Sequence, residues 1–384
     1  MHDCPHVLIT LKTESSSTRK FLRGVCDYAR HFGAWRFLWE PGDSLDVSAF
    51  LERNSVDAFI TMDLPEYRDL LAQELPAVTI LHDKARKPNA ITIDTDDVGL
   101  AAVAAEHFLQ RGYQHFAYFG RHSGLWSLQR EVAFVAAINA AGHEVAVLRA
   151  EFSYSAKGDA RFDAVQVVKW LQMLPKPIAI FAANDHFARH LVDCCRRASI
   201  RVPAACSILG VGLDQYLCEL TNPPLSSVAL DFQQAGYLAA QALDQQMRQR
   251  RAEYLRITAQ AGPVVLRRST DALAVSDPVL ARALQYLQER AHRAVAVHDL
   301  AVHVGLSRRR LEQRFRIAMG TTPQQHHRAV RAAHIARVLL ETKLPLEAIS
   351  EQCGFSEAGN LTRFFKSIKG ESPSAYRKRH MQIS

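Results

Sequence analysis

Short apolar runs alternate with longer segments of helical periodicity through the first 272 residues. The apolar runs fall into two series, and each run is short enough for one buried strand. They occupy residues 6–11, 58–61, 77–81 and 91–93 in the first series, and 115–119, 144–148, 178–182, 207–211 and 226–230 in the second. Helical patterns follow at 17–28, 98–111, 129–141, 162–174, 185–198 and 232–249. This alternation predicts two α/β lobes with parallel sheets, in which ligands bind beyond the carboxyl ends of the strands.

Residues 273–384 lose the strand pattern and are helical throughout. Ser276 and Asp277 form a cap before Pro278, a residue that suits the first position of a helix. The stretch 271–275 before this cap is the best candidate for a linker. We therefore expect an α/β domain at 1–272 and an all-α domain at 273–384.

An internal duplication runs through the all-α domain. Residues 298–307 have the pattern of a short helix, a glycine turn and a serine cap, and they lead into a second helix at 308–315. Residues 346–356 repeat the scheme and lead into a helix at 357–366. Helix, tight turn and capped helix form the helix-turn-helix unit of DNA-binding proteins. A long helix at 323–341 joins the copies and would place their recognition helices about one DNA turn, roughly 34 Å, apart.

Length and charge separate the two domains further. The chain has 384 residues, too many for one ordinary domain, and 48% of them are hydrophobic, enough to form packed cores. Residues 1–272 carry 29 Lys and Arg against 30 Asp and Glu, whereas residues 273–384 carry 18 against 9. The net charge is therefore −1 in the first domain and +9 in the second. This asymmetry indicates a polyanionic partner for the second domain alone.

Charged and polar side chains occupy the outward face of each expected recognition helix. Arginine and glutamine read base edges in the major groove, for about 1–3 kcal/mol per contact. The residues expected to face DNA are Arg308, Arg309, Gln313 and Arg314 in the first copy, and Glu357, Asn360 and Arg363 in the second. The arginines at 308–310 cannot all reach bases, so some of them contact phosphates or solvent. Gly359 within the second helix indicates either a close approach to DNA or a weak constraint.

The sequence offers little for catalysis, redox chemistry or membrane insertion. Its seven cysteines are scattered and form no C-x-x-C pair or zinc spacing. His186 and His190 have the i, i+4 spacing of metal ligands without a third ligand, so a solvated helix face is the simpler interpretation. No glycine-rich phosphate loop or G-x-S-x-G motif occurs. We expect a cytoplasmic protein that is not an enzyme, holds no metal or cofactor, and has neither signal peptide nor membrane span.

Groups that suit a small polyol follow two of the expected strands. Trp126 and Arg130 come after the strand at 115–119, and Asn184 and Asp185 come directly after another. An aromatic ring packs on the C–H face of a sugar, while a guanidinium or a carboxylate hydrogen-bonds its hydroxyls. Asn-Asp after a strand is also a common helix cap, so the pattern leaves a purely structural role open.

Both domains resemble known families. ISEQCGFS (349–356), LTRFFK (361–366) and GESPSAYR (370–377) resemble the signature of AraC-type transcription activators. IDTDD (93–97), HFLQRGYQHFAYFG (107–120) and LRRST (266–270) resemble the sugar-sensing core of LacI-type repressors and periplasmic sugar-binding proteins. A LacI-like core joined to an AraC-like tail resembles the xylose operon regulatory protein family along essentially the full chain.

That resemblance implies a bilobal periplasmic-binding-protein-like core that dimerises and binds a carbohydrate between its lobes. It implies ligand contacts for a first group of residues in the second lobe, and more weakly for a second group on the rim of the first lobe. The first group is Trp126, Arg130 and Asp185, and the second is Ser16, Ser17 and Arg19.

One departure from the family pattern follows the strand at 207–211. Related cores usually present Gly-x-Asp-Asn or Gly-x-Asp-Asp there, and the first Asp binds sugar. This chain instead has Gly212 and Leu213, with Asp214 as the nearest substitute. The departure leaves open xylose, another sugar, a sugar derivative, or a pocket that no longer binds.

Together these features predict a homodimeric, sequence-specific transcription regulator of sugar-catabolism genes, an activator as members of this family usually are. We expect it to bind direct repeats or half-sites in promoter DNA and to work with RNA polymerase. A carbohydrate would close the core and change how the two tails are placed on DNA. Two alternatives stay open. The core serves only to dimerise, or it is a sugar-processing enzyme that carries a DNA-binding tail.

Overall fold

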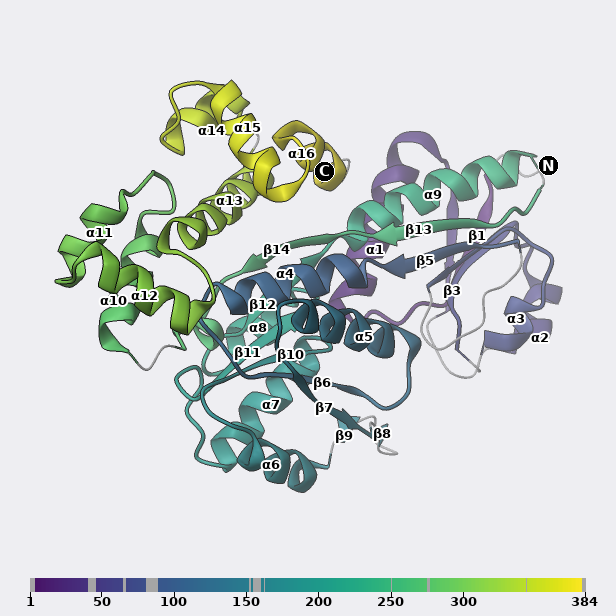
Figure 1. Cartoon of the computed structure of the whole chain (residues 1–384). Helices are drawn as coiled ribbons and strands as arrows, with labels where there is room; N and C mark the ends of the chain where they lie inside the picture. Colours follow the sequence, from purple (N-terminus) through teal and green to yellow (C-terminus); the bar gives the residue numbers. More distant parts are fainter. Residues whose placement is uncertain are drawn as a thin grey trace.

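The computed structural model shows two α/β lobes and a helical domain, arranged along an elongated molecule (Figure 1). It describes residues 4–40, 46–64, 67–80, 89–151, 153–154, 160–161, 163–249, 251–274, 277–342 and 344–381. Residues 275 and 276, part of the expected linker and cap, lie outside the described residues, as do residue 81 of one expected strand and residue 162 of one expected helix. The fold class predicted from the sequence is confirmed.

The first lobe contains a parallel six-stranded sheet of order β13-β5-β4-β3-β1-β2. Its strands are β1 (His6–Ile9), β2 (Arg36–Trp39), β3 (Ala58–Met62), β4 (Ala77–Ile80), β5 (Ile91–Thr95) and β13 (Leu255–Ala259). Its helices are α1 (Ser16–Phe32), α2 (Val47–Arg53), α3 (Arg68–Leu71) and α9 (Phe232–Gln249). The strands β1, β3 and β4 are buried along most of their lengths, which is why they stand out as apolar runs in the sequence.

The second lobe has a six-stranded sheet of order β14-β12-β11-β10-β6-β7, in which only β14 runs antiparallel to its neighbour. Its strands are β6 (Phe116–Arg121), β7 (Val145–Ala150), β10 (Ile178–Ala182), β11 (Cys206–Val211), β12 (Ser226–Leu230) and β14 (Ala261–Val265), with a small hairpin of β8 (Ser153–Tyr154) and β9 (Ala160–Arg161). Its helices are α4 (Asp97–Leu109), α5 (Leu125–Ala140), α6 (Ala164–Met173), α7 (Asp185–Arg197), α8 (Gln215–Leu220) and the 3₁₀ turn η2 (Arg268–Thr270).

The chain crosses between the lobes three times, after β5, after β12 and after β13. The crossing segments hold one another, because Asp96 N–H donates to the Ala259 carbonyl at 3.0 Å and Asp231 N–H donates to the Gln260 carbonyl at 3.0 Å. These crossings form the hinge, and the space between the lobes lies beside the carboxyl ends of the strands.

The helices α1 and α9 cross closely on the first lobe. A Cβ atom on Gly24 would lie 1.8 Å from the Gln233 carbonyl oxygen, and one on Gly236 would lie 2.0 Å from the Phe21 carbonyl oxygen. Only glycine therefore fits at the crossing. The contact fixes α1, whose first turn faces the second lobe.

The helical domain has two halves joined by a long helix, α13 (Pro323–Glu341). The first half contains α10 (Pro278–Glu289), α11 (Val297–Val304) and α12 (Arg308–Met319), and the second contains α14 (Leu346–Gln352), α15 (Ala358–Lys369) and α16 (Pro373–Met381). Each half has its own apolar core, around Leu311 and Phe315 in one and around Leu361 and Phe365 in the other.

Both predicted glycine turns are present, because Gly305 and Gly354 adopt left-handed backbone angles of φ 73° and 70°. Ser307 caps α12 by accepting from the Arg310 N–H, as the sequence predicts. The second copy differs, since Glu357 stands at the cap position of α15 without a side-chain capping bond. Among the described residues, no helix is both long and apolar enough to cross a bilayer.

Candidate functional site: the interlobe cleft and the helix-turn-helix surface

Arg130 is the polar centre of the cleft beside the hinge. Its side chain is 3% exposed, although it carries a full charge. Nε donates to Asp97 Oδ1 at 2.9 Å, Nη1 donates to the Ala183 carbonyl, and Nη2 donates to Thr95 Oγ1 at 3.5 Å. Three of its five N–H groups are thereby used, and the other two have no partner among the described residues.

Asp97 and Trp126 complete this part of the cleft. Burial raises the pKa of the Asp97 carboxyl, while the neighbouring Arg130 charge opposes the rise. The Trp126 ring lies 5.4 Å from the Arg130 guanidinium carbon and packs edge-on against Phe187, with ring centroids 6.4 Å apart. The site thus combines the aromatic ring of Trp126 with the N–H donors of Arg130, the two kinds of group that commonly contact a sugar ring.

Asp185, at the start of α7, is buried, and each of its carboxyl oxygens accepts a hydrogen bond. Oδ1 accepts from Ser227 Oγ and Oδ2 accepts from the Asp214 N–H, both at 2.7 Å. Burial raises the pKa of Asp185 to about 6, although these two hydrogen bonds and the Lys20 charge lower it. Its neighbour Asn184 caps α7, because its side chain accepts from the Phe187 N–H at 3.1 Å.

Two side chains of α1 reach across the cleft to the loop after β11. Arg19 Nη2 lies 3.2 Å from Asp214 Oδ2, and Lys20 Nζ donates to the carbonyls of Gly212 and Leu213 at 2.8 and 3.0 Å. Burial lowers the pKa of Lys20, whereas the Asp185 and Asp214 charges raise it. The lobes are therefore bridged at the point where related cores usually carry a sugar-binding aspartate.

The loop that receives these bridges has an unusual backbone. Leu213 has φ 53°, a left-handed conformation that a branched residue adopts only at a cost. At Gly212, a Cβ atom would stand 3.6 Å from Asp185 Oδ2 and 3.9 Å from Ser17 Oγ. Ser17 and Asp185 therefore approach each other around Gly212, although they belong to different lobes.

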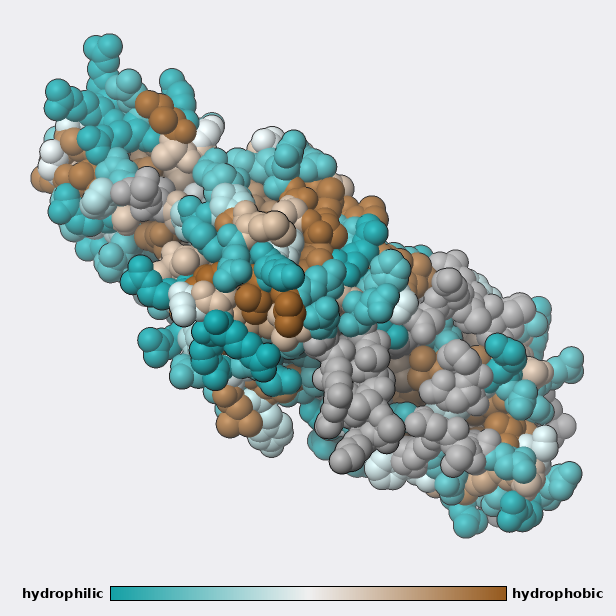
Figure 2. Space-filling model, turned by 90° about the horizontal axis from the view of Figure 1, so that it is seen from below, coloured by the Kyte–Doolittle hydropathy of each residue, from teal (hydrophilic) through white to brown (hydrophobic). Residues whose placement is uncertain are grey.

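The first recognition helix, α12, presents Arg309 and Gln313 to solvent on one stripe. Arg308 is also exposed, but its Nε donates to Glu312 at 2.8 Å. Arg314 turns toward α10, where Nη1 lies 2.7 Å from Asp277 Oδ2. The helical domain is predominantly hydrophilic on the face that Figure 2 shows, where it forms the upper left end of the molecule.

The second recognition helix, α15, has a chain of hydrogen bonds along its exposed face. Arg363 Nη2 donates to Asn360 Oδ1 at 2.7 Å, and Asn360 Nδ2 donates to Ser356 Oγ at 2.9 Å. Glu357 is exposed at the start of the helix, and nothing lies within 4 Å of the position that a Gly359 Cβ would take. Close approach of a DNA backbone at Gly359 is therefore sterically open.

Both parts of the chain match known protein families. The core matches the periplasmic binding protein-like domain over residues 105–270, and the tail matches the helix-turn-helix domain over residues 300–379. The xylose operon regulatory protein of Haemophilus influenzae is 27% identical over 367 residues, which cover 94% of each chain. That of Escherichia coli K12 is 29% identical over 294 residues, which cover 76% of this chain and 74% of the relative. This chain is therefore similar to the xylose operon regulatory proteins over most of its length.

Solved structures share the fold of this chain. The structure of a xylose-binding transcription activator, xylR, aligns with 98% of this chain and 99% of its own, with a TM-score of 0.60 and 24% identity. A complex of the transcriptional regulator CelR with cellobiose aligns with 69% of this chain and 84% of its own, with a TM-score of 0.56 and 18% identity.

The ligand-binding residues predicted from the sequence fall into two groups. Trp126 and Arg130 lie together beside the hinge, and Asp185, Asp214, Ser17 and Arg19 lie around Gly212. Ser16 is the half-buried first residue of α1, and Asn184 is the cap of α7. Their roles in ligand binding stay predictions, as do the roles of the seven residues expected to contact DNA.

The structure adds partners that the sequence analysis did not name. Asp97 and Thr95 hold Arg130, although both belong to the IDTDD motif that carries the family resemblance. Lys20 was also missed, yet it lies one helical turn after Ser16 and Ser17 and therefore shares their face.

A metal site is not evident in the described part of the chain. No group of three or more His, Cys, Asp or Glu side chains is placed there to hold an ion. His190 instead lies 3.6 Å from Cys194 Sγ, and burial lowers the pKa of His190 to about 4.

Proposed function

We propose that this protein is a sequence-specific transcription regulator of sugar-catabolism genes, controlled by a carbohydrate bound between the lobes of its core. The observation that carries the proposal is the pairing of two recognition helices, both with exposed arginines, with a hinged core whose cleft holds Trp126 and Arg130. Xylose is the first effector to test, because the relatives regulate the xylose operon by name and one solved relative is described as xylose-binding.

The DNA half of the proposal is tested with promoter fragments from the protein's own operon. Arg309→Ala and Arg363→Ala should each reduce discrimination between specific and random DNA by about 1–3 kcal/mol per lost base contact. Arg196→Ala is the matched control, because it removes the same charge from an exposed position on α7 of the core. Fluorescence anisotropy measures all three, and equal losses in the control and the two variants would contradict the proposal.

The sugar half is tested by thermal unfolding of the full chain against a panel of sugars, with D-xylose first. A ligand at a hundred times its dissociation constant stabilises the folded state by about 2.7 kcal/mol. Arg130→Lys should remove the shift, because lysine keeps the charge beside Asp97 but loses the planar fork. A variant that keeps the full shift would exclude Arg130 from the binding site.

A second candidate function is supported by the bridges of Arg19 and Lys20. These side chains already join the lobes at Gly212, where related cores usually carry a sugar-binding aspartate. The core is therefore compatible with a ligand-independent role in dimerisation. A panel that produces no shift with any sugar favours this alternative. In both versions we propose a homodimer that binds half-sites, contacts RNA polymerase and acts in the cytoplasm, where its promoter DNA lies, with no enzymatic step.

A further inference from the structure

The end of α4 and the turn after it contact both helix-turn-helix units. Glu106, on the last turns of α4, pairs with Lys369 Nζ at 2.6 and 2.8 Å, and Lys369 is the last residue of α15. Gln114 Nε2 donates to the carbonyl of Ala318 at 3.0 Å, and Ala318 lies in the last turn of α12. One short segment of the core therefore holds the carboxyl ends of both recognition helices.

The same segment also holds the connection between the domains. Arg111 Nε donates to the Thr270 carbonyl at 3.0 Å, and the Ala274 N–H donates to the Arg111 carbonyl at 2.9 Å. The last described residues of the core, Thr270 and Ala274, are thus held by Arg111, two residues beyond the end of α4. A movement of this segment would move the connection and the recognition helices together.

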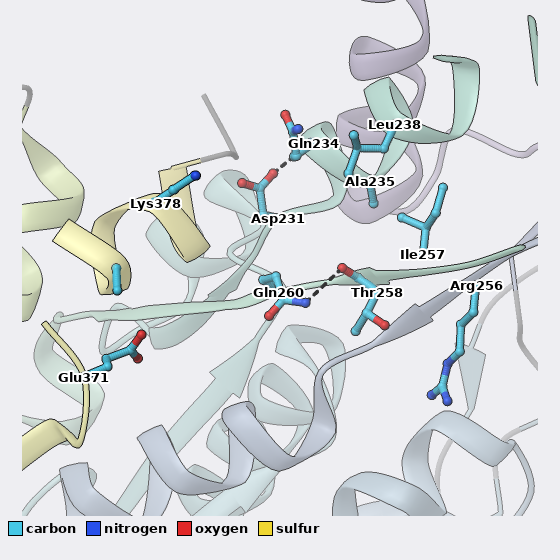
Figure 3. Close-up of a pocket in the computed structure, with 11 residues that line it drawn as sticks. Asp231, Gln234, Ala235, Leu238, Arg256, Ile257, Thr258, Gln260, Glu371 and Lys378 are labelled. Carbon is cyan, nitrogen blue, oxygen red and sulfur yellow. Dashed lines mark hydrogen bonds between the residues drawn. The ribbon is translucent and has the colours of Figure 1, made fainter. Parts of the chain in front are cut away.

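The domains stand apart on the side of the hinge. A groove of about 720 Å³ separates the hinge residues Asp231 and Gln260 from Glu371 and Lys378 of the helical domain (Figure 3). The groove leaves the second half of the helical domain room to tilt toward or away from the hinge. The contacts at the end of α4, together with the packing of α13 against β14, therefore hold the helical domain against the core.

The opposite end of α4 lies in the cleft. Its first residue, Asp97, accepts from Arg130 Nε at 2.9 Å and from Thr95 Oγ1 at 3.0 Å. The thirteen residues of α4 span about 20 Å at the rise of an α-helix. A rigid helix thus connects the polar centre of the cleft to the contacts with the helical domain.

The contacts leave the reading faces free. Lys369 and Ala318 lie at the carboxyl ends of their helices, whereas Arg309, Gln313 and Arg363 are exposed. The docked arrangement therefore aligns the recognition helices and does not mask them.

We propose that α4 and the turn after it, residues 97–114, form a platform through which the core sets the orientation of both recognition helices. The effect on DNA rests on the proposed function, whereas the platform itself does not. The platform changes position when the cleft changes at Arg130, and the recognition helices follow as one unit.

The platform is tested in the full chain without effector or DNA, by hydrogen exchange. In the double variant Glu106→Gln/Gln114→Ala, peptides that contain the Gly320 and Gly370 amides should exchange faster, by about fivefold for a partly buried ion pair. Glu52→Gln, an exposed carboxamide substitution on α2 of the first lobe, is the matched control and should exchange like the wild type. Equal exchange in the double variant and the wild type would overturn the platform.

Measurements of DNA binding distinguish a failure of the platform proposal from a failure of the proposed function. The wild type should bind paired half-sites and lose most of its affinity when five base pairs, half a helical turn, are inserted between them. The double variant should bind a single half-site like the wild type but tolerate the insertion. A wild type that binds no promoter DNA refutes the proposed function, and the exchange experiment then decides the platform alone. If the insertion reduces the affinity of the double variant as much as that of the wild type, the platform proposal is wrong, although the protein binds DNA.

Discussion

Asp185→Asn should make the core more stable at neutral pH, although it removes a charge whose two oxygens each accept a hydrogen bond. The Asp185 carboxylate is buried, and burial raises its pKa to about 6 against an ordinary value of 3.8. The Ser227 hydroxyl, the Asp214 N–H and the Lys20 charge reduce the cost of burial without removing it. An asparagine fits the same place, since its oxygen accepts from the Asp214 N–H and its amide donates to the Ser227 hydroxyl.

The magnitude follows from the displaced pKa. The pKa of Asp185 is higher in the folded state than in the unfolded state. Protonated Asp185 therefore contributes to the stability of the protein below pH 3.8, and this contribution is lost as the pH rises through about 6. A pKa that is higher by about 2 in the folded state corresponds to about 3 kcal/mol in the free energy of unfolding. The free energy of unfolding of the variant, relative to the wild type, should therefore rise by up to that amount between about pH 4 and pH 7.

Urea unfolding of both proteins across this pH range measures the effect. Taking the difference between the variant and the wild type cancels the titration of groups elsewhere, such as His326 and His334, whose pKa values burial lowers to about 4. A difference that stays constant from pH 4 to pH 7 would refute the reasoning. A difference that falls with pH would mean that the Asp185 carboxylate is stabilised by its partners and not penalised by burial.

Three further substitutions test other parts of the structure. Lys20→Met should raise the pKa of Asp185 further, because the Lys20 charge lowers it, and the pH midpoint of the same unfolding comparison should move upward. Gly236→Ala should destabilise the core by about 1–3 kcal/mol in urea, because the added Cβ would lie 2.0 Å from a backbone carbonyl oxygen of α1. Gly359→Ala should stabilise the helical domain by about 0.5–1 kcal/mol, since its Cβ meets nothing within 4 Å; a simultaneous loss of DNA affinity would show that DNA approaches Gly359 closely.

Much of the fold follows from local pattern, because its central strands are buried on both faces. Strands such as β10 and β12 begin and end where the apolar runs do. The edge strands β2 and β13 escaped the same analysis, whereas the edge strand β7 was predicted. The strand β2 is half exposed, and β13 begins with two exposed residues, so neither forms a clean apolar run.

The topology of the hinge was beyond the sequence for a different reason. The strand β13 pairs with β5, more than 150 residues earlier in the chain, and the strand that follows it pairs with β12 in the other lobe. Such pairings depend on tertiary packing and leave no periodic signal. The helix-turn-helix copies, in contrast, are local units whose glycine turns and inward Leu and Phe positions lie within twenty residues, and the sequence predicted them well.

Residue types alone could not show which groups between the lobes are available to a ligand. The sequence pointed to Arg130 and Asp185 as ligand-binding groups, and the structure places both at the cleft, but each is already held by protein partners. Among the described residues, two N–H groups of Arg130 have no protein partner and are open to a sugar, whereas the Gly212 carbonyl is open only if Lys20 is displaced. Displacement would exchange a contact between the lobes for contacts with the ligand. The affinity for any sugar thus depends on how much the bridge itself stabilises the closed core, and a ligand shifts the lobes only by its difference in affinity between the two states.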